Sequence, residues 1–152
     1  MTRDRFLIGI LVGIGVLIAA ALILFFIRSE NSEYVDDSTP QGALRNYFLA
    51  IHQRDYQRAY AYIMESAQKP DFDQFHKHFT EYNVDTLSRT VVEIGEELPA
   101  VQSERVSIRV YLIRPATSLL GETTRSARTV VLVRQDGQWK LEDAPYPFWV
   151  YR

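Results

Sequence analysis

The sequence predicts an α+β protein in which an N-terminal transmembrane helix precedes three short helices packed on a curved antiparallel sheet of about four strands. The first observation is a run of 22 residues, 6–27, without a charged or hydrogen-bonding side chain. The second is that apolar residues recur at helical spacing between residues 40 and 82. The third is a change toward strand-like alternation from residue 85 onward. Helices followed by consecutive strands favour an α+β fold over a doubly wound parallel sheet.

The apolar run is long enough to cross a membrane, because a helix rising about 1.5 Å per residue covers about 33 Å and a bilayer core is about 30 Å thick. A cleaved signal peptide would have a shorter apolar core of about 7–15 residues and a small-residue cleavage site after it. This run instead ends in bulky residues and Arg28. We therefore expect an uncleaved single-pass anchor.

The charged residues beside the anchor predict its orientation. Arg3 and Arg5 precede the span, and only Arg28 follows it closely. The positive-inside rule then places the N-terminus in the cytoplasm and the C-terminal domain outside it. Gly9 and Gly13 have the spacing that lets two membrane helices approach closely, although glycine is also common in membrane helices that make no such contact.

Three segments follow from this division of the chain. Residues 1–28 form the cytoplasmic tail and anchor, residues 29–38 an acidic linker, and residues 39–152 one folded extracytoplasmic domain. The linker contains few apolar residues, so we expect an extended or frayed tether. The domain has enough residues for a single hydrophobic core.

The three helices are predicted from capping residues and apolar spacing. Thr39 and Pro40 begin a helix that continues to Gln53, Asp55 caps a second that continues to about Ser66, and Asp71 caps a third. Their apolar faces are Leu44, Tyr47, Phe48 and Ile51; then Tyr56, Ala59, Tyr60 and Ile63; then Phe72, Phe75, His76, Phe79 and Tyr82.

Strands are predicted from Asp85 onward. The first contains Thr90, Val92 and Ile94, and the second alternates cleanly over residues 106–112. Residues 129–133 are a continuous apolar run that we expect to be buried on both faces, and Asp136-Gly137 is typical of a tight hairpin turn. The aromatic segment 145–151 contains two prolines, which suits an edge or cover strand.

Residues 40–63 (PQGALRNYFLAIHQRDYQRAYAYI) and 130–141 (VVLVRQDGQWKL) resemble the opening helices and closing hairpin of the nuclear transport factor 2-like superfamily. The resemblance covers roughly residues 39–141 and implies a cone of curved sheet closed by helices. That superfamily includes enzymes, carriers and scaffolds, so the resemblance implies a fold and no particular activity.

No catalytic, cofactor or metal site is predicted. The catalytic aspartates and tyrosine of enzymes that resemble ketosteroid isomerase have no matching positions, and the sheet carries arginines where inward-facing carboxylates would be needed: Arg105, Arg109, Arg125 and Arg128. His76 and His78 would point about 200° apart on a helix and so cannot share a metal ion. The residues after 27 include 15 basic and 18 acidic side chains, which makes nucleic acid an improbable partner.

Two hypotheses about function remain. The leading one is a non-catalytic scaffold or accessory-subunit domain, anchored in the lipid bilayer of a bacterial membrane. Its partner would be another protein or a second copy of this chain. Its contact surface would be the aromatic tail, with Tyr146, Phe148, Trp149 and Tyr151, unless that tail packs back over its own domain, which the sequence allows equally. The alternative is a binder of a small hydrophobic ligand, or a weak isomerase- or cyclase-like enzyme, with a pocket lined by Tyr47, Ile51, Tyr60, His76 and Phe79.

Overall fold

The computed structural model describes residues 10–21, 33–99, 103–116 and 121–148. The chain forms two units, Met1–Glu33 and Tyr34–Arg152. In the first unit residues 10–21 are helical with exposed side chains. No helix among the described residues has the length and apolar character needed to cross a bilayer. The predicted span, 6–27, lies partly outside the described residues, as does Gly9.

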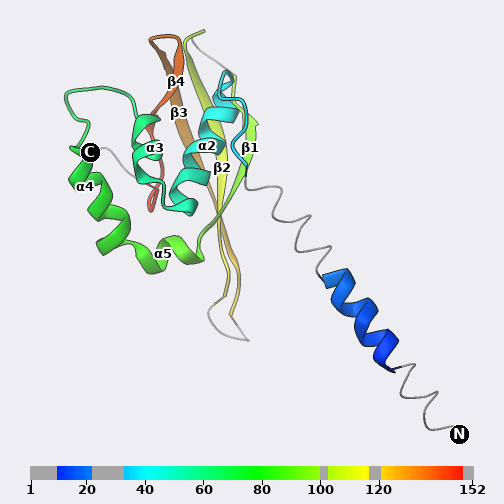
Figure 1. The fold of residues 1–152 in the computed structure, drawn as a ribbon. Coiled ribbons are helices and arrows are strands. Elements are labelled where there is room, and N and C mark those ends of the chain that lie inside the picture. Colours follow the sequence, from blue (N-terminus) through cyan, green and yellow to red (C-terminus); the bar gives the residue numbers. More distant parts are fainter. Residues whose placement is uncertain (1–9, 22–32, 100–102, 117–120, 149–152) are drawn as a thin grey trace, which may run out of the picture. The chain divides into compact units, whose positions relative to one another are not determined.

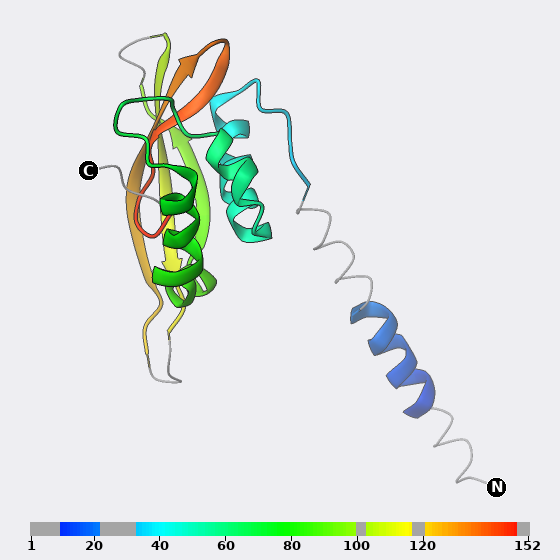
Figure 2. The ribbon, with the colours of Figure 1, turned by 60° about the vertical axis from the view of Figure 1, so that its left-hand side comes forward.

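The second unit has the predicted α+β architecture. Four strands form one antiparallel sheet in the order β1-β2-β3-β4: β1 (Val91–Glu97), β2 (Arg105–Arg114), β3 (Thr124–Gln135) and β4 (Gln138–Asp143). The helices of this unit lie on one side of the sheet (Figures 1 and 2). They are more numerous than predicted: α2 (Pro40–Gln53), α3 (Tyr56–Ala61), α4 (Phe72–Lys77), η2 (His78–Tyr82) and α5 (Val84–Arg89).

Helix α2 has the predicted bounds because both of its ends are determined locally. The Thr39 hydroxyl accepts a hydrogen bond from the amide of Gly42, and Pro40 occupies the first turn. At the other end Arg54 adopts a left-handed conformation (φ 61°), and its amide donates to the last carbonyls of the helix. The predicted apolar face of α2 is buried.

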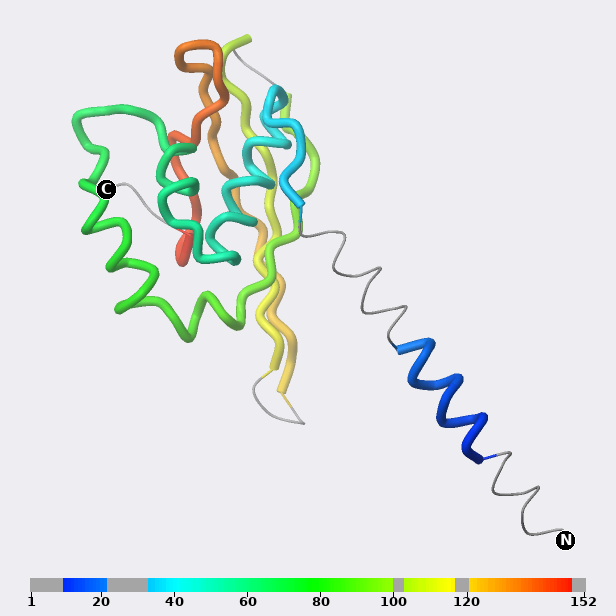
Figure 3. Tube along the Cα trace, viewed as in Figure 1, coloured from blue at the N-terminus to red at the C-terminus, as the bar shows by residue number. Residues whose placement is uncertain are grey.

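Helix α3 begins at its predicted cap, Asp55, but ends at Ala61 and not near Ser66. The chain then pairs with the edge of β4: the amide of Met64 donates to the carbonyl of Leu141, and the amide of Leu141 donates to the carbonyl of Tyr62. Figure 3 shows this part of the trace beside β4 before it loops out toward α4. Pairing with a strand edge replaces the last predicted turns of the helix, which a helical spacing pattern does not anticipate.

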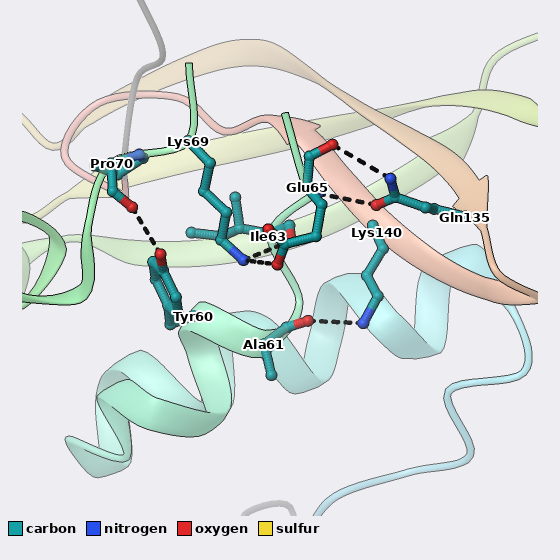
Figure 4. A network of polar contacts seen from close by, with 8 residues as sticks. All are labelled: Tyr60, Ala61, Ile63, Glu65, Lys69, Pro70, Gln135 and Lys140. Carbon is teal, nitrogen blue, oxygen red and sulfur yellow. Dashed lines mark hydrogen bonds and ion pairs between the residues drawn. The ribbon is translucent and has the colours of Figure 1, made fainter. Parts of the chain in front are cut away.

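Polar contacts fix the segment between α3 and α4 to the β3–β4 hairpin (Figure 4). The Lys140 ammonium donates to the carbonyl of Ala61 at 2.7 Å, and the Gln135 side-chain amide exchanges two hydrogen bonds with the backbone of Glu65. Burial lowers the pKa of Lys140, with the nearby Lys69 ammonium as a second cause. The Tyr60 hydroxyl of α3 donates to the carbonyl of Pro70 at 2.7 Å and so connects the two ends of this segment.

The third helix is interrupted, whereas the first predicted strand, with Thr90, Val92 and Ile94, is confirmed as β1 to within a residue at its start. α4 starts at its predicted cap, Asp71, but the next turn, η2, is a π-helix, and residues 84–89 form helix α5, although the spacing was expected to become strand-like from Asp85 onward. The wider π turn changes the phase of the helix, so Tyr82 points to solvent and is 73% exposed. The prediction that Tyr82 shares the buried face is therefore wrong.

The alternation predicted for β2 is confirmed: Val106, Ile108, Val110 and Leu112 are buried. The prediction for residues 129–133 is wrong, because β3 alternates and only Val130 and Leu132 are fully buried there. At the hairpin, Asp136 (φ 52°) and Gly137 (φ 79°) both have positive φ, as the predicted tight turn requires.

The predicted linker is only partly a tether, because residues 34–38 pack onto the folded domain. The Asn46 side chain, 1% exposed, accepts from the amide of Val35 at 2.9 Å and donates to its carbonyl at 2.7 Å. At Gly42 an added Cβ would lie 2.0 Å from the carbonyl oxygen of Asp36, so only glycine permits this approach. We call residues 34–38 the strap. Residues 29–32 lie outside the described residues.

Candidate functional site

The chain's own side chains fill the centre of the concave side of the sheet. The largest fully buried residues include Tyr47, Phe75, Phe79 and Phe148. Phe75 and Phe79 pack edge to face, with 4.8 Å between their ring centroids, and Tyr47 and Phe148 each pack edge to face against Phe48. The Tyr47 hydroxyl donates a hydrogen bond to the carbonyl of Phe148. The centre of the cone is therefore a packed core.

A cleft of about 160 Å³ opens at the side of this core. Its apolar floor comes from Ile51, Phe79 and Leu87, the first two of which are almost fully buried. Its rim carries polar and partly exposed residues: His52, Arg54, Tyr56, Val84 and Ser88. We call this feature the side cleft. An apolar cavity of about 150 Å³ holds one benzene ring, so the side cleft has room for a single aromatic or aliphatic group.

One wall of the side cleft is built by the turn between α2 and α3. The left-handed Arg54 ends α2, and the Asp55 carboxylate caps α3 by accepting from the amide of Arg58. These two adjacent caps place Tyr56 across the cleft from the end of α2. A non-glycine residue in the left-handed region costs of order 1 kcal/mol, and such conformations are common at functional sites.

The opposite wall comes from η2 and α5. The Tyr56 ring stacks on Phe79 of η2, with centroids 5.8 Å apart. The Thr80 hydroxyl donates to the carbonyl of His76 at 2.9 Å, and such a side-chain contact competes with regular helical bonding. Val84, at the start of α5, is 46% exposed beside the opening.

The side cleft is weakly polar and contains no carboxylate among its lining residues. The protein around His52 partly desolvates its ring, which lowers the pKa of this histidine. The Phe148 ring lies 6.0 Å from His52, so the C-terminal segment lies behind the rim. Within the described residues, no group of three or more histidine and acidic side chains is arranged to hold a metal ion.

A second concavity lies on the concave side of the β2–β3 hairpin, beside the C-terminal segment. It measures about 460 Å³, and we call it the arginine groove. Its lining residues are Leu112, Arg114, Ser126, Arg128, Thr129, Asp143, Ala144, Pro145 and Tyr146. A third concavity of about 310 Å³ lies at the β4 edge near Met64 and Glu142.

The structure distributes the five predicted pocket residues over different places. Ile51 and Phe79 line the side cleft. Tyr47 is in the core, Tyr60 bonds to Pro70, and His76 packs between aromatic rings, 5.1 Å from Tyr56. The lining residues of α5 were not predicted, because strand-like spacing was expected from Asp85 onward. Val84 and Leu87 have an i, i+3 spacing that is compatible with a helix.

The predicted contact residues in the tail also separate. Tyr146 is 49% exposed and lines the arginine groove, whereas Phe148 is fully buried against Phe48, with 4.9 Å between ring centroids. Phe148 thus belongs to the domain's own core. The segment turns back on itself, with the amide of Phe148 donating to the carbonyl of Pro145, in place of the predicted strand. Trp149 and Tyr151 lie outside the described residues.

Two further predictions concern Gly13 and the face of the sheet on which four arginines lie. In the helix over residues 10–21 an added Cβ on Gly13 would meet nothing within 4 Å, so its role in a helix contact stays a prediction. In the sheet Arg105, Arg109 and Arg125 were predicted to face inward, but their strand positions alternate with the buried residues and they face outward. Arg128, which pairs with the buried Val110, faces inward as predicted.

Comparison with known proteins supports the fold and goes no further. No family model matches the chain, and no curated protein sequence matches it. A solved SEC-C motif containing protein from Rhodopseudomonas palustris is similar, with a TM-score of 0.50 and 9% identity over 72% of this chain and 79% of that one. At such low identity the similarity shows a shared fold alone.

Two further solved structures have lower scores. A SEC-C motif containing protein from Psychrobacter arcticus has a TM-score of 0.49 and 10% identity, covering 76% of this chain and 65% of that one. Delta 5-3-ketosteroid isomerase from Mycobacterium sp. has a TM-score of 0.44 and 13% identity, covering 68% of this chain and 91% of that one. Scores below 0.5 describe partial matches of the backbone and carry no statement about function.

Proposed function

We propose that this protein is a non-catalytic interaction domain whose side cleft receives one apolar or aromatic side chain of a partner protein. The packed centre of the concave side, where a ligand pocket was the alternative, supports this proposal most directly. Pockets for small ligands usually measure about 300–1,000 Å³. The side cleft has about half of the lower value, although it has the apolar floor and polar rim that an anchoring side chain requires.

The arrangement of the rim also supports a protein partner. Tyr82, at the end of η2, and Val84, at the start of α5, are exposed side chains with large apolar parts, close together in the chain. An aromatic anchor entering the side cleft would contact the floor residues Ile51 and Leu87 and cover Val84. Burying an apolar side chain of this kind contributes about 1.5–3 kcal/mol to association before entropic costs.

Co-purification from detergent extracts, followed by mass spectrometry, tests the proposal. Val84→Lys places a charge at the opening, and Val91→Lys is its control, because Val91 is a similarly exposed valine (55%) that does not line the cleft. We expect the partner to be recovered with wild type and Val91→Lys and lost with Val84→Lys. Recovery of the same proteins with both variants would contradict the proposal.

We also propose that residues 6–27 anchor the domain in a bacterial membrane, with the N-terminus in the cytoplasm. The length and apolar character of that run support an anchor, and the two arginines before it support the orientation. Protease added to intact spheroplasts should then digest the C-terminal domain. Protection of the domain in spheroplasts, with digestion after lysis, would contradict this orientation.

A second candidate function is the binding of a small hydrophobic ligand in the side cleft. The position of His52 and Arg54 at the rim favours it, because a few polar groups around an apolar floor are typical of ligand sites. An isomerase of the ketosteroid type would need a carboxylate base, and the described lining has none. Native mass spectrometry separates the candidates: a small-molecule mass increment in wild type that is absent from Val84→Lys would favour the ligand.

A further inference from the structure

The arginines of the sheet differ in their partners according to the face they occupy. Each of the three outward-facing arginines has a glutamate within 3.0 Å: Arg105 with Glu142 at 2.9 Å, Arg109 with Glu96 at 2.6 Å, and Arg125 with Glu93 at 3.0 Å. Arg114 and Arg128, on the concave face, form no ion pair with any carboxylate in the described part of the chain. The Arg128 guanidinium donates to the backbone carbonyl of Ala127 at 2.9 Å. The concave end of the β2–β3 hairpin therefore carries two guanidinium groups that no described carboxylate pairs with, although Asp143 lines the same groove.

The strand register places these two arginines along one line in the arginine groove. Arg128 is opposite Val110, and Arg114 lies four residues further along β2, with the Leu112–Ser126 pair between them. Four residues of strand cover about 13 Å. An extended segment of about four residues would therefore reach both guanidinium groups.

The other lining residues suit a polypeptide. Tyr146 is half exposed at the edge of the groove, and Leu112, 2% exposed, forms part of an apolar floor with Ala144 and Pro145. Tyrosine and arginine are, with tryptophan, enriched among the residues that contribute most to binding energy at protein interfaces. A membrane surface is a plane and fits such a concave groove poorly, whereas a chain segment can enter it.

We propose that the arginine groove binds an acidic, extended segment of the partner protein, with carboxylates paired to Arg114 and Arg128 and an apolar side chain against Tyr146. This inference rests on the proposed function and names the chemistry of the partner. Arginine–carboxylate pairs are charge-assisted and frequently bidentate, which gives both affinity and orientation. Asp143 also lines the groove, and its charge opposes an acidic ligand.

Fluorescence anisotropy with labelled hexaglutamate tests the inference on the full chain in phosphatidylcholine nanodiscs, at about 50 mM salt to limit screening. The matched pair of variants is Arg128→Glu and Arg134→Glu, because both positions are exposed arginines of β3 and Arg134 lies outside the groove. We expect Arg128→Glu to weaken binding about tenfold or more and Arg134→Glu less than about twofold. Asp143→Asn should strengthen it.

Two results would overturn the inference. One is the absence of hexaglutamate binding to wild type. The other is an equal loss in Arg128→Glu and Arg134→Glu, which would indicate attraction to the general charge of the surface. Failure of the proposed function gives a different result, because the partner would then still co-purify with Val84→Lys. If Val84→Lys loses the partner but Arg128→Glu retains it fully, the interaction domain stands and the arginine groove is not its acidic site.

Discussion

Replacement of Asn46 by leucine should loosen the strap and destabilise the domain. The Asn46 side chain makes two hydrogen bonds with the backbone of Val35 and a third, at 3.3 Å, with the hydroxyl of Tyr62. Leucine has a similar volume and none of these polar groups. At about 1 kcal/mol for each lost bond, we expect the free energy of unfolding to fall by roughly 2–3 kcal/mol.

The assay is urea unfolding of the full chain in non-ionic detergent, followed by fluorescence of the buried Trp139, together with hydrogen exchange at the Val35 amide. Ser38→Ala is the control, because Ser38 bonds to Asp36 in the same strap at an exposed position. We expect it to change stability by less than about 0.5 kcal/mol. Equal stabilities of Asn46→Leu and wild type, with unchanged Val35 exchange, would refute the account of the strap.

Two further predictions concern the sheet and the response to pH. Gly95→Ala should lower stability by about 1–3 kcal/mol in a thermal melt, because its Cβ would lie 2.9 Å from the Tyr111 ring and 3.0 Å from the carbonyl oxygen of Arg109; an unchanged melting temperature would contradict this packing. Burial lowers the pKa of His78, whose Nε2 donates to the carbonyl of Pro147 at 3.0 Å. The folded protein favours the neutral ring, so this contribution to stability is complete at pH values above the ordinary histidine pKa of about 6.5. The free energy of unfolding should therefore decrease as the pH drops below about 6.5, and it should decrease less in His78→Gln. Parallel profiles of stability against pH for the two proteins would contradict this.

Elements determined by neighbouring residues were predictable from the sequence. Thr39 and Pro40 specify the start of α2 locally, and Asp136-Gly137 specifies the β3–β4 turn. The alternation of β2 was equally clear, because one face of that strand packs on the core and the other faces solvent. In each case the physical cause lies within a few residues of its effect.

Elements determined by distant contacts were not predictable. α3 ends early because residues 62–64 pair with β4, about 80 residues further along the chain. Asn46 gave no sequence signal, since its function depends on where residues 34–38 pack. The side cleft was found only in part for the same reason: Ile51 and Phe79 were predicted from their apolar faces, whereas Leu87 required the unpredicted helix α5.

Photocrosslinking from residue 84 in intact cells tests most directly whether the side cleft holds a protein partner. A benzophenone amino acid replaces Val84 in one strain and Val91 in another, and the two positions have similar exposure. The account predicts a discrete, higher-mass protein adduct after irradiation from position 84 and none from position 91. No adduct from position 84, or the same adduct from both positions, would contradict it.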